Sequence, residues 1–341
     1  MALDVAALRQ QFPMLQRRVG GKPIHYLDSA NTSQKPVCVI DAMSRFMREG
    51  YGPIGRSSYT LASEASDAYE EARAKVARFI NARSPREVVF TKNATESLNL
   101  AAQSWGRANL GKGDAVVLTH MEHHANIVPW QMLAAEKGFE IRWLPLTPDF
   151  RLDLASLDSL LRGAKAFAFT SMSNVLGTIN PVRELCEAAH RAGAIAIVDG
   201  CQSVPHMATD VQAWGADMLA FSSHKMCGPT GVGVFWAHES LLDAMPPFLG
   251  GGGMISEVKL DNFTCAELPA KFEAGTPPIV EVIGLGAAID FLNGLGMSEV
   301  RRHEIELTNY AYRALKDRYG DDITIHGATN PELRGATFSF A

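Results

Sequence analysis

The sequence has no long apolar run and no excess of basic residues. Nowhere do the 341 residues reach the roughly 18 to 20 uninterrupted apolar positions that a membrane-spanning helix needs. Lys and Arg number 32 against 37 Asp and Glu, which gives a formal charge of −5 and argues against a surface built for nucleic acid. The sequence therefore predicts neither a membrane protein nor a nucleic-acid-binding protein.

Paired cysteines are also missing. The five cysteines are odd in number, widely spaced and contain no C-x-x-C pair, which argues against a disulfide framework and against a zinc ribbon. The N-terminus has no apolar segment followed by a small-residue cleavage site, so we expect no secretion signal. This cysteine usage suits a reducing compartment, and we expect a cytoplasmic protein. The cysteines are Cys38, Cys186, Cys201, Cys227 and Cys265.

From about residue 86, short apolar runs alternate with helical patterns. Strands that alternate with helices predict an α/β fold, with a mainly parallel sheet and helices on both faces. No helical pattern separates the last two of these runs, so an antiparallel pair is expected there. The expected strands are 87–91, 115–118, 141–144, 166–170, 194–198, 218–221 and 232–236, and the expected helices are 95–107, 125–137, 153–161 and 182–192.

The pattern changes after Gly286. Helices are expected at 287–295 and 298–319, with Ser298 as a cap, and strands at 323–325 and 336–341. At the other end of the chain, a short helix is expected after Asp4 as its N-cap. Because the last strand pattern stops without a turn, we expect the chain to end inside a domain. The predicted domains are a large one at 23–286 and a small one made of 1–22 and 287–341, with its C-terminal part missing.

Polar residues follow several predicted strands, at the edge where open parallel sheets bind ligands. Asp199 follows the strand 194–198 and can pair with a protonated ring nitrogen, or it can cap a helix. Lys225 follows the strand 218–221 and is flanked by Ser, His and Gly. A lysine in a partly desolvated pocket can form a Schiff base with a carbonyl. The run Gly228–Gly231 lets backbone pass close to a ligand, or it is simply a tight turn.

Two further strand ends carry weaker signals. Ala94 and Thr95 lie at a predicted helix N-terminus, which favours a phosphate, although an ordinary capping box explains them as well. His123 can offer an imidazole that stacks on an aromatic cofactor. Zinc is the rival interpretation of His120, His123 and His124, but no other Cys or His falls at ligand spacing, so no metal is expected.

Six ordered motifs run through the chain: YLDSANTSQKP (26–36), MEHHANIVPWQ (121–131), SNVLGT (173–178), VDGCQ (198–202), SSHKMCGPTGVGV (222–234) and FEAGTP (272–277). With them the chain resembles pyridoxal-phosphate enzymes of the class V aminotransferase superfamily, and specifically group II (SufS-type) cysteine desulfurases and selenocysteine lyases. The resemblance implies fold type I, the aspartate aminotransferase fold. It has a large domain with a mainly parallel seven-stranded sheet and a smaller α+β domain, which we expect to be truncated here.

The resemblance also implies roles for individual residues. Lys225 holds pyridoxal 5'-phosphate as an internal aldimine and moves the substrate proton, and Asp199 keeps the ring nitrogen protonated. His123 stacks on the ring, and these three are the expected catalytic residues. The other expected cofactor ligands are Ala94, Thr95, Ser222 and His224 and the partner subunit's Thr276 at the phosphate, with Gln202 and Asn174 at the phenolic oxygen. Substrate would bind at Ala30, Asn31 and Asn174.

The implied reaction is the conversion of L-cysteine to L-alanine, with sulfur passed as a persulfide to a SufE- or SufU-type acceptor for iron–sulfur cluster assembly. L-selenocysteine is an alternative substrate, and a homodimer is expected. Two other possibilities stay open. One is a related pyridoxal-phosphate lyase, selenocysteine lyase or aminotransferase that needs no nucleophilic cysteine. The other is a cofactor-binding partner protein without sulfur activity.

The sequence departs from the family pattern at several positions. Asn31, Ser223 and Cys227 stand where the family usually has Ala, Gly and Tyr. The family's C-terminal loop with the nucleophilic cysteine, and a later carboxylate-binding Arg, are not among the 341 residues. We therefore expect the 341-residue form to be impaired. Cys201 and Cys227 flank cofactor positions, but a free cysteine is usually a small buried hydrophobe, and neither is expected to be the nucleophile.

Overall fold

The computed structural model describes residues 3–55 and 57–341, and the chain forms two compact units. Unit 1 contains residues 98–220 and 297–341, and unit 2 contains residues 3–97 and 221–296. Helix α4 (Ala94–Leu100) begins in unit 2 and continues into unit 1. The boundaries of these units differ from the expected domain boundaries at 22/23 and 286/287. The expected domains stay a prediction.

Unit 1 is built on parallel strands, whose pairs are β4 with β5, β4 with β6, β6 with β7, and β7 with β8. All residues of β4, β6 and β8 are buried, because a parallel sheet is covered on both faces. This is why these strands are continuous apolar runs in the sequence. The strands are β4 (Ala115–Thr119), β5 (Glu140–Leu144), β6 (Ala166–Thr170), β7 (Ile195–Asp199) and β8 (Met218–Ser222).

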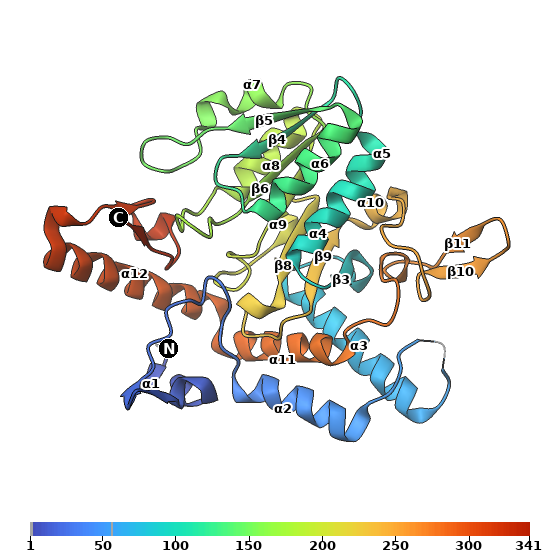
Figure 1. Ribbon diagram of the computed structural model, residues 1–341, viewed down its shortest axis with the longest axis horizontal. Coiled ribbons are helices and arrows are strands. Elements are labelled where there is room, and N and C mark those ends of the chain that lie inside the picture. The colour runs from blue at the N-terminus through green and yellow to red at the C-terminus, as the bar shows by residue number, and fades with distance from the viewer. Residues whose placement is uncertain (1–2, 56) are drawn as a thin grey trace. The chain divides into compact units, whose positions relative to one another are not determined.

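Apart from the short α9, which was not predicted, the helices of unit 1 fall where the sequence patterns predict them (Figure 1). Helix α6 carries Pro129 in its first turn and ends at Gly138, whose φ of 77° is the left-handed conformation that favours glycine at a helix end. The helices are α5 (Arg107–Asn109), which continues α4 through a π-helical stretch, α6 (Val128–Lys137), α7 (Leu157–Leu161), α8 (Val182–Arg191), α9 (Val211–Trp214) and α12 (Met297–Tyr319).

Two details of the predicted C-terminal region were wrong. Helix α12 begins at Met297, so Ser298 lies in its first turn and does not cap it. The last strands, β12 (Ile325–His326) and β13 (Ser339–Phe340), are shorter than predicted. Strand β13 starts later than residue 336 because the carbonyl oxygen of Thr337 accepts a hydrogen bond from the Arg334 guanidinium, at 2.6 Å.

Unit 2 is built on three long helices that lie side by side, α2 (Val37–Arg45), α3 (Thr60–Phe79) and α11 (Ile279–Leu295) (Figure 1). A Cβ added at Gly286 of α11 would lie 3.1 Å from the Cβ of Ala72 in α3. Small residues at both positions therefore allow these helices to approach closely. At the start of the unit, Asp4 caps α1 (Val5–Gln10) by accepting a hydrogen bond from the Ala7 amide, as predicted.

The strands of unit 2 are antiparallel. β3 (Val88–Thr91) pairs with β9 (Gly233–Ala237), and β10 (Ile255–Val258) pairs with β11 (Phe263–Cys265) as a hairpin that extends from the unit (Figure 1). Short elements complete unit 2: β1 (Arg18–Val19), β2 (Lys22–Pro23) and α10 (Glu239–Ala244).

Strands β3 to β9 belong to one mainly parallel sheet with the order β3-β9-β8-β7-β6-β4-β5. The predicted α/β class is confirmed. In the part of the chain that the structure describes, no single helix is long and apolar enough to cross a membrane. The consecutive pair α11 and α12 meets that test only when both are counted together.

Candidate active site

Asp199 is the last residue of β7 and is buried. Its Oδ1 accepts a hydrogen bond from the Cys201 amide at 2.9 Å, and its carbonyl oxygen accepts one from the Ser171 hydroxyl at 2.9 Å. The residues that follow form turns up to Met207, and no helix begins at Asp199. The alternative interpretation of Asp199 as a helix cap was therefore wrong. A carboxylate fixed at this strand end can hold a proton on a ring nitrogen.

His123 is exposed and follows β4 in the same unit. Its Nδ1 accepts a hydrogen bond from the Ala125 amide at 3.1 Å, so the neutral ring carries its proton on Nε2. Gln202 is buried close after Asp199, and Asn174 is half-buried in the turn 173–178. The Ser173 hydroxyl accepts the Leu176 amide in that turn, at 3.0 Å. Unit 1 therefore presents an imidazole, a carboxylate and amides after strands β4, β6 and β7.

Glu122, which we did not predict, fastens the His123 segment to the sheet. Its Oε1 contacts the Thr119 hydroxyl at 2.5 Å and accepts the Thr170 amide at 2.9 Å, and its Oε2 accepts the Asn126 amide at 2.7 Å. Burial raises the pKa of Glu122 to about 8; the three hydrogen bonds oppose the shift, and the charge of Asp199 adds to it. Glu122 therefore carries a proton at neutral pH.

Lys225 lies in unit 2, in the turn after β8. The side chain is half-buried, and in the part of the chain that the structure describes its amine has no hydrogen-bond or ion-pair partner. Burial, together with the charges of Lys225 and Lys35, lowers the pKa of the neighbouring His224 imidazole. An amine in this setting is available for covalent attachment to an aldehyde.

Ala94 and Ser222 meet at the start of α4. The Ala94 amide donates to the Ser222 hydroxyl at 2.8 Å. The capping box that was the alternative interpretation is present, because Asn93 Oδ1 accepts the Glu96 amide at 3.0 Å and the Glu96 carboxylate accepts the Lys92 amide at 2.6 Å.

Backbone packs tightly at this helix start. A Cβ added at Gly233 of β9 would lie 2.4 Å from the carbonyl carbon of Asn93, so only glycine lets β9 pass here. Thr95 is the exposed member of the first turn of α4. Thr95, Ser222 and His224 thus offer hydroxyl and imidazole donors on the elements around the helix start.

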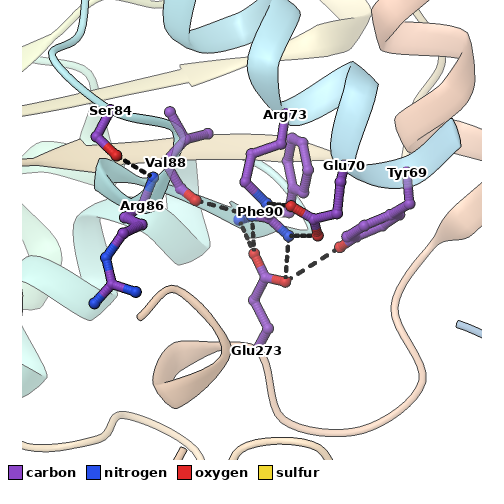
Figure 2. Close-up of polar contacts among 8 residues, drawn as sticks. All are labelled: Tyr69, Glu70, Arg73, Ser84, Arg86, Val88, Phe90 and Glu273. Carbon is purple, nitrogen blue, oxygen red and sulfur yellow. Dashed lines mark hydrogen bonds and ion pairs between the residues drawn. The ribbon is translucent and has the colours of Figure 1, made fainter. Parts of the chain in front are cut away.

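Thr276 is exposed in the segment after Glu273, and Glu273 anchors that segment (Figure 2). The Glu273 carboxylate accepts hydrogen bonds from the Phe90 amide of β3 at 2.7 Å and from the Arg73 guanidinium at 2.7 and 3.0 Å. Tyr69 adds a longer bond from its hydroxyl, at 3.3 Å. The FEAGTP motif is therefore tied to β3 and α3 through its glutamate.

The three departures from the family pattern all lie in unit 2. Asn31 is exposed, and its side chain contacts the Asp28 carboxylate at 3.4 Å. The Ser223 hydroxyl is buried and has no hydrogen-bond partner in the described part of the chain, and a Cβ added at Gly228 would lie 2.0 Å from it. Burial raises the pKa of the Cys227 thiol to about 11, so Cys227 is a thiol at neutral pH. Ala30 precedes Asn31 and is half-buried.

The residue types fit pyridoxal phosphate. Unit 2 offers the unpartnered Lys225 amine and hydroxyl groups near a helix start, and unit 1 offers a buried carboxylate and an exposed imidazole. A metal has less support, because in residues 3–55 and 57–341 no three His, Cys, Asp or Glu side chains gather as ligands.

Comparison with known proteins identifies relatives along nearly the whole chain. Residues 25–341 match the family model of class-V aminotransferases. A probable cysteine desulfurase of Streptomyces coelicolor is 49% identical over 99% of this chain and 82% of its own. A cysteine desulfurase of Enterobacter sp. is 47% identical over 100% of this chain and 83% of its own.

Two solved structures share the fold. The apo structure of a cysteine desulfurase from Thermococcus onnurineus superimposes with a TM-score of 0.94 at 36% identity, and covers 100% of this chain with 83% of its own. A cysteine desulfurase from Escherichia coli gives a TM-score of 0.90 at 37% identity with the same coverage. The predicted fold type is confirmed by these neighbours.

Proposed function

The chain belongs to the class-V aminotransferase family, and we propose that it is a pyridoxal-phosphate-dependent cysteine desulfurase that converts L-cysteine to L-alanine. The observation that carries the proposal is the Lys225 amine, half-buried and without a partner in the described residues, directly after β8. Relatives at 47–49% identity that carry this name support it. The two other functions that the sequence left open, a related pyridoxal-phosphate enzyme such as a lyase and a sulfur-inactive partner protein, are distinguished by the test below.

When bound, pyridoxal phosphate supplies an electron sink that stabilises a carbanion at the substrate Cα. Lys225 attaches the cofactor and moves the proton at Cα, because its amine is the unpartnered base of this turn. Asp199 holds the proton on the ring nitrogen, since its carboxylate is fixed at the end of β7 by the Cys201 amide. His123 provides an exposed imidazole face for the ring, with Nε2 as its protonated nitrogen.

The phosphate and the substrate are assigned to the remaining polar residues. Thr95, Ser222 and His224, with the Ala94 backbone and the partner subunit's Thr276, bind the phosphate. Gln202 and Asn174 donate to the phenolic oxygen, and Ala30, Asn31 and Asn174 face the substrate. Cys227 is not the sulfur-accepting nucleophile, because its raised pKa keeps it protonated. A cysteine thiolate must attack the substrate sulfur, so that an S–S bond forms as the Cβ–S bond breaks, and we propose that the sulfur reaches a SufE- or SufU-type acceptor as a persulfide for iron–sulfur cluster assembly. L-selenocysteine is a second substrate.

We propose that the protein forms a homodimer and that it is cytoplasmic. The hairpin β10–β11 carries exposed Val258, Leu260 and Phe263, which is apolar surface suited to burial against a second copy. The five cysteines are free, which suits a reducing compartment. Sedimentation should give the mass of a dimer, and Leu260→Asp with Phe263→Asp should shift it to the monomer.

The test of the function is chemical attachment at Lys225. The protein is incubated with pyridoxal phosphate, reduced with borohydride and digested, and mass spectrometry locates the added mass. We expect it on the Lys225 peptide, and we expect Lys225→Ala to lose both the label and at least about 100-fold of the turnover of L-cysteine. Lys112→Ala, on an exposed lysine of unit 1, is the matched control and should keep both.

The products separate the candidate functions. Alanine with transferable sulfur identifies a desulfurase, whereas pyruvate with ammonia identifies an eliminating lyase. Label and turnover that persist in Lys225→Ala would remove Lys225 from its role. A labelled protein that forms neither set of products, even when a small thiol is added to accept the sulfur, would be the sulfur-inactive partner.

A further inference from the structure

The carbonyl oxygen of His224, the residue before Lys225, accepts hydrogen bonds from several donors in the segment 32–35, which is distant in sequence. The Ser33 amide and the Ser33 hydroxyl each lie 3.0 Å from it. The Thr32 hydroxyl lies at 3.2 Å and the Lys35 ammonium at 3.0 Å. All of these residues belong to unit 2. A carbonyl oxygen has two lone pairs, so this oxygen is fully engaged.

The same segment also holds the peptide on the other side of Lys225. The Cys227 amide donates to the Ser33 hydroxyl at 2.8 Å. Cys227 has a φ of 66°, the left-handed conformation that a non-glycine residue adopts only when its surroundings hold it there. Ser33 therefore fixes the backbone both before and after Lys225.

The position of the Lys35 ammonium is energetically unfavourable, because it is partly withdrawn from water. Its side chain is half-buried, and burial lowers the pKa of its ammonium. In residues 3–55 and 57–341, no carboxylate lies within ion-pair distance of it, and its partners are the carbonyl oxygens of Ser33 and His224. A lysine usually extends to solvent, so a desolvated ammonium on two carbonyl oxygens indicates that this contact is needed.

We propose that Ser33 and Lys35 are positioning residues for Lys225, which they hold in place by fixing the peptide on either side of it. This inference rests on the proposed function, because that function gives Lys225 its role. The contacts of Ser33 and Lys35 do not depend on it. A reacting amine must lie within about 3–3.5 Å of its target. A fixed backbone at Lys225 leaves only the side-chain torsions to place that amine.

The contacts are tested first in cofactor-free protein, by amide hydrogen exchange of peptides covering 30–36 and 222–228. Lys35→Met removes the charged donor, and Ser33→Ala removes the hydroxyl. We expect the amides in both peptides to exchange at least about tenfold faster, since a charge-assisted hydrogen bond is worth that factor or more. Lys271→Met is the matched control, because Lys271 also donates to two carbonyl oxygens, those of Leu242 and Asp243, at 3.0 and 2.9 Å. It should leave both peptides unchanged.

The role toward Lys225 is tested by the rate at which pyridoxal phosphate becomes attached, sampled by borohydride reduction at fixed times. Lys35→Met should attach it about tenfold more slowly at an unchanged melting temperature of the cofactor-free protein. Lys35→Arg keeps the charge and should recover the parent rate within about threefold. A purely structural role would instead lower the melting temperature and leave the rate per folded molecule unchanged.

Exchange and attachment at parent rates in both Lys35→Met and Ser33→Ala would overturn the proposal. Should Lys35→Met fail to fold, Ser33→Ala alone decides it, because that change removes only one hydroxyl. If the parent protein takes no label on Lys225, the proposed function fails, and the exchange data alone decide whether Ser33 and Lys35 position this peptide.

Discussion

Glu122 in unit 1 and Glu273 in unit 2 are two glutamates withdrawn from water, but among residues 3–55 and 57–341 a cation lies beside Glu273 and none beside Glu122. The Glu273 carboxylate pairs with the Arg73 guanidinium and accepts the Phe90 amide (Figure 2). Glu122 is 7% exposed, and in the residues that the structure describes its carboxyl has uncharged partners, two side chains and one backbone amide. One carboxyl is thus stabilised by a neighbouring charge and the other by its own proton.

The difference shows that a glutamate can serve as a structural anchor either with a guanidinium partner or with uncharged partners. Burial opposes the charge of Arg73, but Glu273 and Glu70 more than offset this and raise its pKa. The three hydrogen bonds to Glu122 only partly offset its burial, and its pKa rises to about 8. Both anchors hold a segment that carries an expected cofactor residue, His123 after Glu122 and Thr276 after Glu273.

The largest effect is expected from breaking the ion pair of Glu273. Arg73→Met removes the cation and leaves a carboxylate 10% exposed without its main partner, which costs about 3–5 kcal/mol of unfolding free energy. Guanidinium denaturation measures the loss. A loss below about 1 kcal/mol would mean that Glu273 needs no cation and behaves like Glu122.

The second prediction concerns Glu122→Gln, which mimics the protonated carboxyl. Because the folded-state pKa of Glu122, about 8, exceeds its ordinary value of 4.5, its contribution to stability is fully present below pH 4.5 and is lost as the pH rises to 8. The parent should therefore lose roughly 2–4 kcal/mol relative to the variant over this range. Urea denaturation at pH 4.5, 6, 7 and 8 follows it. A constant difference across these pH values would show that Glu122 is ionised in the folded protein.

Removing one hydroxyl group next to each glutamate tests how much each carboxyl depends on a single hydrogen bond. Thr119→Val removes a hydroxyl that contacts Glu122 at 2.5 Å and also accepts the Met121 amide at 3.2 Å, and should cost about 1–2 kcal/mol. Tyr69→Phe removes only the 3.3 Å bond to Glu273 and should cost about 0.5 kcal/mol. Denaturation of both variants in the same buffer compares them. The reverse order would mean that the charged carboxylate depends more on its hydroxyl than the neutral one does.

The smallest effect is expected at Arg86, which Figure 2 draws at the left, below Ser84. Its guanidinium pairs with Glu239 at 2.9 Å and Glu267 at 3.2 Å on the surface, where water screens the charges. Arg86→Gln should leave the denaturation midpoint within experimental error of the parent. A clear shift would show that ion pairs in this unit stabilise regardless of burial, and would weaken the contrast with Arg73.

Much of the architecture could be predicted from the sequence, whereas the site residues stay predictions. The strands β4, β6 and β8 are apolar runs because both faces are covered, and Asp4 is a cap because its side chain bonds three residues ahead. Asp199 and Lys225 could be selected as candidates because Asp199 ends β7 and Lys225 lies in the turn after β8. Each of these features depends on residues close along the chain, or on the burial that a strand requires.

Only the tertiary structure decided which distant groups hold the site residues in place. Arg73 meets Glu273 across 200 residues, and Lys35 meets the His224 carbonyl across 189. No local pattern encodes such partners, because they depend on how the helices and turns pack. The proton on Glu122 belongs to the same class: the sequence determined that a carboxyl stands before His123, but the folded structure, by excluding water and providing no cation, decided that it stays neutral.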